Sequence, residues 1–256
     1  MGASRKDDDL LGGNWVRVGH GVAYQQVNAG PAILIAYGGY SARLGHTAAW
    51  ATELVNARLG AAGVGHVYAV QGPVDPSYTG REIANSALRA HLATLAGDAA
   101  PIYVVAHSSG SFVAHELFAQ LHAAGSAAAL ARIAYANLDG GGAGLTAEIA
   151  AGLARVVFVY ARDPTLESGL SQNSSVMRSL GVIYAPHGEV FEVAVSGTGC
   201  SSGACWSLHN VLITHRPHSA TSFDVASDYT DFVDRPVTTE YLDVLISRSL
   251  GSDLTA

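Results

Sequence analysis

The chain has 256 residues, of which 49% are hydrophobic and only 14% are charged. This composition excludes an intrinsically disordered chain, which needs few apolar residues and a high density of charge. The net charge of −7 argues against nucleic acid as the main partner, because binding to phosphates needs clustered cations.

The start of the chain, Met1 to Asp9, is polar and charged and lacks the apolar centre of a signal peptide. We expect residues 1–13 to form a flexible N-terminal segment and residues 14–256 to form a single domain. No apolar run reaches the roughly 18 residues that a membrane-spanning helix needs, so we expect no integral membrane contact.

Short apolar runs alternate with segments of helical spacing along the rest of the chain. A hairpin comes first, over Trp15 to Val27 around Gly19-His20-Gly21. Near-continuous apolar runs are typical of parallel strands buried on both faces. The predicted strands are Ala32–Tyr37, Val67–Val70, Ile102–Ala106, Ile133–Ala136, Val156–Tyr160 and Val190–Val195.

Four helices are predicted between and after these strands, each with apolar residues at helical spacing and a glycine at its end. Thr47 is the expected N-cap of the first. The four extend from Thr47 to Gly60, from Ile83 to Gly97, from Phe112 to Gly125 and from Tyr241 to Gly251. Repeated strand–helix units after a hairpin indicate an α/β domain with a mostly parallel sheet.

The strongest chemical signal is Ala106-His107-Ser108-Ser109-Gly110, between a predicted buried strand and a predicted helix. A tight turn from strand to helix needs small residues two before and two after the serine, and it exposes the serine above the helix N-terminus. The free N–H groups at that end suit a developing oxyanion.

On these residues the chain resembles the α/β-hydrolase superfamily of serine esterases and lipases, with Ala106 in place of the first glycine of G-x-S-x-G. The resemblance implies a mostly parallel central sheet flanked by helices in one domain over residues 14–256. The segment between the strands at 133 and 156 is too short for a large cap domain. The resemblance also implies that Ser108 is the nucleophile and that the triad follows the order Ser, Asp or Glu, His.

The acid of such a triad follows a later strand. Asp163, in Ala161-Arg162-Asp163-Pro164 after the strand at 156–160, is the favoured candidate. Asp139, in Asn137-Leu138-Asp139-Gly140 one strand earlier, is the rival, since the family places its acid at either position. The alternative interpretation of either aspartate is an ordinary turn residue, because aspartate favours turns.

The base is expected in a loop after the final strand. His209 fits that place if the strand at 190–195 is the last one. If Val211–Thr214 is instead the last strand, His215 or His218 is the base. These three histidines do not form a dedicated zinc motif such as H-E-x-x-H, so we expect no metal.

Two backbone donors are needed for the oxyanion. The N–H of Ser109 is the expected first donor. The second is expected from the turn Gly38-Gly39-Tyr40-Ser41, with Gly39 or Tyr40 as the donor, since this turn resembles the glycine-rich oxyanion turn of esterases. A plain Gly-Gly turn is the alternative interpretation.

The chain is therefore expected to cleave carboxylic esters through an acyl-enzyme, without a cofactor. The substrate would be a small-molecule, lipid or polymer ester, and Tyr37, Tyr40 and Trp206 are candidates for lining its pocket. An acyltransferase or thioesterase would use the same residues, and a small-molecule binding protein without catalysis would share the fold.

Cys200 and Cys205 lie in one loop rich in glycine and serine. A disulfide between them would indicate an oxidising compartment and a secreted protein, whereas two reduced thiols would indicate a cytoplasmic one.

Overall fold

The structure is a computed structural model that describes residue 11 and residues 13–40, 42–73, 81–92, 100–195, 204–213 and 238–247. Within these residues, ten strands form one sheet, most of whose neighbouring strands are parallel. Its order is β1-β2-β4-β3-β5-β6-β7-β8-β10, with β9 also paired to β7. The strands are β1 (Val16–Gly19), β2 (Val22–Gln26), β3 (Ala32–Tyr37), β4 (Val64–Val70), β5 (Ile102–His107), β6 (Ile133–Leu138), β7 (Arg155–Arg162), β8 (Leu170–Ser171), β9 (Gly188–Ala194) and β10 (Ala204–Cys205).

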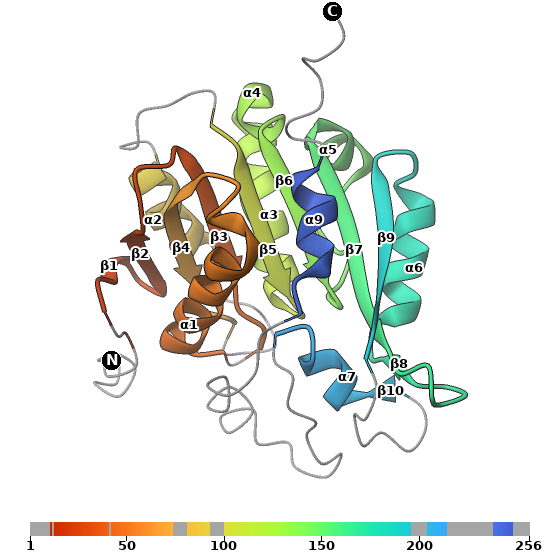
Figure 1. Ribbon diagram of the computed structural model, residues 1–256. Coiled ribbons are helices and arrows are strands. Elements are labelled where there is room, and N and C mark those ends of the chain that lie inside the picture. Colours follow the sequence, from red (N-terminus) through yellow and green to blue (C-terminus); the bar gives the residue numbers. More distant parts are fainter. Residues whose placement is uncertain are drawn as a thin grey trace, which may run out of the picture.

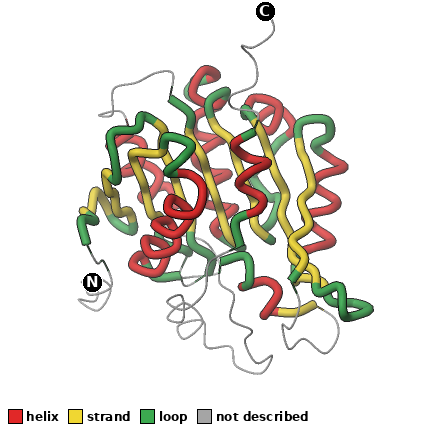
Figure 2. The backbone as a smooth tube through the Cα atoms, viewed as in Figure 1, coloured by secondary structure: helices red, strands yellow, loops and turns green. Residues whose placement is uncertain are grey.

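Helices cover both faces of this sheet (Figures 1 and 2). One face packs against α1 (Leu44–Leu54), the π-helical turn η2 (Val55–Leu59), α7 (Trp206–Asn210) and α9 (Glu240–Ile246). The other packs against α2 (Arg81–Leu92), α3 (Gly110–Ala123), α4 (Ala127–Leu130), α5 (Ala147–Gly152) and α6 (Ser174–Ile183). Residues of β3 alternate between the two cores, as the two-residue repeat of a strand requires.

The predicted hairpin is confirmed as β1 and β2, and the six predicted strands correspond to β3, β4, β5, β6, β7 and β9. The prediction that Thr47 caps the first helix is wrong. The helix begins at Leu44, and the hydroxyl of Thr47 donates to the carbonyl of Arg43 one turn earlier, which is a bond made inside a helix. The end predicted for the second helix at Gly97 and that of the last at Gly251 lie outside the described residues.

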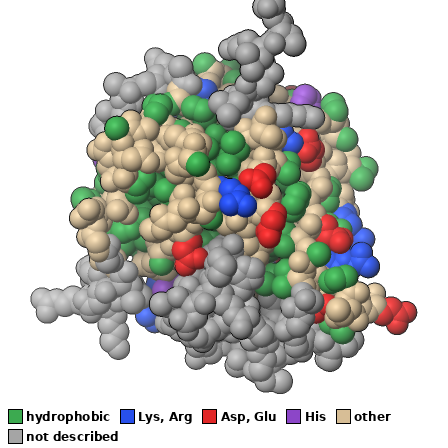
Figure 3. Space-filling model, viewed as in Figure 1, with side chains coloured by type: hydrophobic (Ala, Val, Ile, Leu, Met, Phe, Trp, Pro, Cys, Tyr) green, Lys and Arg blue, Asp and Glu red, His purple; other side chains and the backbone are tan. Residues whose placement is uncertain are grey.

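The surface agrees with the low charge of the sequence. On the face drawn in Figure 3, the coloured acidic and basic side chains are few and scattered among neutral ones. Among the described residues, no helix is both long enough and apolar enough to cross a membrane.

A buried histidine holds the segment that follows β6. His115 on α3 donates from Nδ1 to the carbonyl of Ala143 (2.8 Å), and its Nε2 accepts from the hydroxyl of Tyr135 (3.0 Å). Burial lowers the pKa of His115 to about 4, against a partly compensating hydrogen bond to Ala143. The neutral ring is therefore part of the folded structure.

We expect this burial to make the protein sensitive to acid. Below pH 6.5 the unfolded chain binds a proton at His115, whereas His115 stays neutral in the folded chain down to about pH 4. The free energy of unfolding should therefore fall by about 3 kcal/mol as the pH falls from about 6.5 to about 4. In urea titrations across this range, His115→Gln should show a shallower fall in the free energy of unfolding than wild type. His122→Gln, exposed on the same helix, is the matched control. Parallel falls in wild type and His115→Gln would contradict the assignment.

Candidate active site

Three neighbouring strands end at the same level of the sheet. The register pairs Tyr37 of β3 with Ala106 of β5, and His107 of β5 with Leu138 of β6. The chain segments that follow these strands therefore lie side by side at the carboxyl edge. Open α/β sheets bind their ligands at this edge.

Ser108 occupies the sharp turn between β5 and α3. Its φ of 52° lies in the left-handed region, which is uncommon for a residue with a Cβ atom. Its N–H donates to the carbonyl of Leu138 (2.9 Å), and its side chain is partly exposed rather than packed in the core. A Cβ atom on Gly110 would lie 2.4 Å from the carbonyl oxygen of Gly38, so the turn needs glycine there. The predicted strand–turn–helix around the serine is thus present.

The residue after β6 forms a buried pair with a histidine from far along the chain. His209 Nδ1 lies 2.6 Å from Asp139 Oδ2, and the two residues are 2% and 0% exposed. Since the carboxylate accepts, Nδ1 carries the proton, and Nε2 of the neutral ring is left as an acceptor. The structure thus brings the favoured histidine together with the rival aspartate.

Asp163, the aspartate favoured from the sequence, lies elsewhere. Because Leu138 pairs with Val159, Asp163 lies three residues beyond the level of Asp139, or about 10 Å along β7. Its carboxylate accepts from the backbone N–H (3.0 Å) and hydroxyl (2.6 Å) of Thr165, which is the pattern of an Asx turn. The structure therefore pairs His209 with Asp139 and not with Asp163, because β7 extends past the end of β6 and carries Asp163 beyond the level of Asp139. Which aspartate acts as the acid stays a proposal.

His209 also rests on the residue before the serine. His107 Nε2 donates to the carbonyl of His209 (3.1 Å), and the two ring centroids are 4.6 Å apart. Burial lowers the pKa of His107 well below its ordinary value, with a further lowering by His209 that the bond to the carbonyl opposes. His107 is therefore a neutral support for α7, which lies below the sheet in Figure 1. The alternatives His215 and His218 lie outside the described residues.

The glycine-rich turn after β3 contacts the start of α3. The carbonyl oxygens of Tyr37 and Gly38 are the atoms that a Cβ on Gly110 would meet. The N–H of Gly38 donates to Val70 (3.0 Å), which leaves the next two N–H groups of the turn, those of Gly39 and Tyr40, as candidate oxyanion donors.

The residue that follows Ser108 and two of the proposed pocket residues are also placed. Ser109 is buried at the N-terminus of α3, a fourteen-residue helix whose dipole favours negative charge there. Tyr40 is 38% exposed, whereas Tyr37 is buried and its hydroxyl donates to Asn85, so Tyr37 belongs to the core. The side chain of Trp206 and the residues Ser41 and Cys200 lie outside the described part of the structure, and the disulfide with Cys205 stays a prediction.

Two residues near Asp139 were not anticipated. The hydroxyl of Ser171 donates to Asp139 Oδ1 (2.7 Å), and the backbone N–H of Asn173 reaches both carboxylate oxygens (3.1 and 3.2 Å). Their segment, β8 and the start of α6, carries no motif. Its approach to Asp139 depends on tertiary packing that sequence periodicity does not report.

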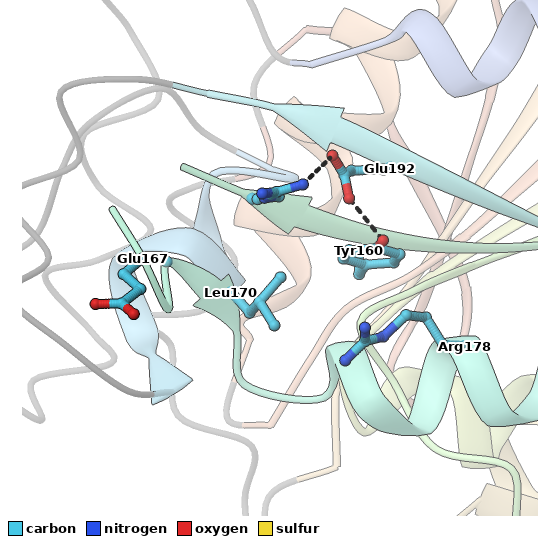
Figure 4. A pocket seen from close by; sticks show the side chains of 7 residues that line it. Tyr160, Glu167, Leu170, Arg178 and Glu192 are labelled. Atoms are coloured by element: carbon cyan, nitrogen blue, oxygen red, sulfur yellow. Dashed lines mark hydrogen bonds and ion pairs between the residues drawn. The ribbon is translucent and has the colours of Figure 1, made fainter. Parts of the chain in front are cut away.

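A polar pocket of about 280 Å³, separate from the His209–Asp139 pair, lies between β7, β9 and α6. In Figure 4, Glu192 accepts from the hydroxyl of Tyr160 (2.6 Å), and Arg178 from α6 lies near the Tyr160 ring. Leu170 forms part of the wall beside the β8 residue that contacts Asp139. Among the described residues, no group of three or more His, Cys, Asp or Glu side chains is arranged to hold a metal ion.

Comparison with solved structures finds similar folds, several of them in proteins described as esterases or hydrolases. An esterase/lipase from an uncultured bacterium is 12% identical with a TM-score of 0.48, and covers 76% of this chain and 81% of its own. TT1662 from Thermus thermophilus is 15% identical with a TM-score of 0.46, and the match covers 69% of this chain and 85% of TT1662. The carboxylesterase CesB from Bacillus subtilis is 8% identical with a TM-score of 0.43, and the match covers 75% of this chain and 88% of CesB. No protein-family model and no curated protein matches the sequence. The fold itself, a mostly parallel sheet with helices on both faces, is the α/β-hydrolase fold, and the segment between β6 and β7, residues 139–154, holds no large cap.

The left-handed backbone at Ser108 gives a direct test of this geometry. Glycine adopts a positive φ without penalty, so Ser108→Gly should be more stable than Ser108→Ala by about 1 kcal/mol. At Ser179, exposed in the middle of α6, the order should reverse, because alanine favours a helix over glycine by about 1 kcal/mol. Urea denaturation of the four variants measures both differences. The same order at both positions would contradict the strained turn.

Proposed function

We propose that this protein is a serine hydrolase that cleaves carboxylic esters, with Ser108 as nucleophile, His209 as base and Asp139 as acid. The observation that carries the proposal is the buried His209–Asp139 pair at the same sheet edge as the left-handed turn of Ser108. A serine hydroxyl needs a neighbouring base to become a nucleophile, and the base needs an orienting carboxylate.

Ester cleavage would proceed in two steps. His209 Nε2 takes the hydroxyl proton as Ser108 Oγ attacks the ester carbonyl, and the imidazolium then returns that proton to the departing alcohol. Water attacks the acyl-enzyme with His209 again as base, and the acid is released. Asp139 holds the ring through Nδ1 and stabilises its charged form.

The oxyanion of each tetrahedral intermediate would accept hydrogen bonds from the backbone N–H of Ser109 and from that of Gly39 or Tyr40. The contact between the turn after β3 and the start of α3 supports this pairing. Each such donor is worth about 100- to 1000-fold in rate.

The substrate is an ester of a small molecule, a lipid or a polymer. Only residues 139–154 lie between β6 and β7, and they contain the short helix α5, so this segment supplies no cap over Ser108. A serine that the segment 139–154 leaves open suits substrates that extend beyond the site on that side. The chemistry needs no cofactor.

Labelling tests the nucleophile. A fluorescent alkylphosphonate should modify wild-type protein at Ser108 alone, as located by mass spectrometry of peptides, and the same protein should hydrolyse short-chain chromogenic esters. Ser108→Ala should lose both reactions while remaining folded by circular dichroism. A wild type that neither reacts with phosphonate nor hydrolyses any of a panel of esters would overturn the proposal in favour of a binding protein without catalysis.

The choice of acid gives a matched pair of variants. Asp139→Asn should lower kcat by about 10³- to 10⁴-fold, because an amide at this position no longer holds the imidazole in the required tautomer. Asp163→Asn retains an oxygen that can accept from Thr165 and should keep a rate close to wild type. Steady-state kinetics on one chromogenic ester compares them. A larger loss for Asp163→Asn than for Asp139→Asn would restore Asp163 as the acid.

A further inference from the structure

We infer that Ser171 and Asn173 are positioning residues, which together hold Asp139 in the one orientation that presents Oδ2 to His209. The inference rests on the proposed function, since it deepens the role of Asp139 in that reaction. It concerns a segment that carries no recognisable motif in the sequence.

The backbone of Asp139 needs support of its own. Its φ of 46° is left-handed, which costs a residue with a Cβ atom about 1–2 kcal/mol. The N–H of Asp139 donates to Val159 on β7 (2.8 Å), and its carbonyl accepts from Asn173 Nδ2 (2.7 Å). The peptide groups on either side of the strained residue are thus fixed by two different segments.

The carboxylate is fixed as well. Ser171 Oγ donates to Oδ1 (2.7 Å) and at the same time accepts from the N–H of Ala161 (3.1 Å), so its single proton is directed at Asp139. The Asn173 N–H is shared between both oxygens, and His209 takes Oδ2. Ser171, Asn173 and His209 all donate to the carboxylate, which is the arrangement that suits an ionised carboxylate, and bonds to charged groups are the stronger ones.

Both residues come from a segment that returns to the site after β7. Leu170 of β8 pairs with Arg162, the last residue of β7, and Ser171 follows at 1% exposure. Asn173 is the N-cap residue of α6, but its side chain makes no capping bond to that helix and is used on Asp139 instead. A side chain diverted from its own helix to the strained residue is the clearest sign of a positioning role.

Kinetics of Ser171→Ala and Asn173→Ala test the inference. Each should lower kcat on a chromogenic ester by about tenfold or more with little change in KM. Ser171→Ala loses a hydrogen bond to the buried carboxylate, and Asn173→Ala loses the bond to the carbonyl of Asp139 that holds its left-handed backbone. Ser179→Ala, which removes an exposed hydroxyl on α6, should leave kcat and KM unchanged. Wild-type kcat in folded Ser171→Ala would overturn the inference, and this variant decides if Asn173→Ala does not fold.

A double-mutant cycle separates positioning from general structural damage. If Ser171 acts through Asp139, Ser171→Ala should cause no further loss in an Asp139→Asn background, because residues that act as a unit are not additive. An equal loss in both backgrounds would mean that Ser171 acts independently of Asp139 and would overturn the inference.

A proton NMR measurement separates this inference from the proposed function. The His209 Nδ1 proton, bonded to a carboxylate, should give a downfield resonance that disappears in Asp139→Asn, shifts in Ser171→Ala and stays unchanged in Ser179→Ala. This readout requires no turnover. An unreactive wild type with a shifted resonance in Ser171→Ala would end the proposed function and leave the positioning role standing, whereas an unshifted resonance would end the positioning role.

Discussion

The buried contact between Asp139 and His209 is the constraint on which the rest of the site depends. A carboxylate with no exposed surface is costly to fold unless it is paired and hydrogen-bonded. Its partner comes from α7, seventy residues farther along the chain, so the bond also fixes where α7 docks against the sheet. Such a pair is weak support for stability in general. Its position beside a strained serine is what gives it a chemical meaning.

The sheet supplies the remaining geometry by ending three strands together. With β5 in the middle, Ser108 has the turn after β3 on one side and Asp139 after β6 on the other. The two candidate oxyanion donors and the proposed acid therefore lie on opposite sides of the serine. Parallel strands bring these segments together without long connections, because their carboxyl ends share one edge of the sheet and each is followed by a loop there.

Most of the fold could be predicted from local patterns, and the placement of the two candidate aspartates shows the limit of such patterns. The strand over Ala32–Tyr37 was found to the residue, because a run buried on both faces carries its own signature. The choice between Asp139 and Asp163 depended instead on how far β7 extends beyond β6, which is a matter of register. Strand β8 was missed because it has only two residues. Helix α6 was missed although its buried residues Ser174, Met177, Leu180 and Gly181 recur at helical spacing. The contacts of Ser171 with Asp139 arise from that unrecognised part of the chain.

His107, the variable position of the serine motif, has a consequence for how such a motif tolerates change. Its ring packs at a tilt of 43° against that of His209, with 4.6 Å between centroids, and its Nε2 donates to the carbonyl of the same residue. The size of the His107 ring and its hydrogen bond therefore help to set the distance between α7 and the end of β5. A smaller residue at this place would leave a void beneath His209, and a bulkier one would displace α7, so the variable position of the motif is constrained by packing in this chain.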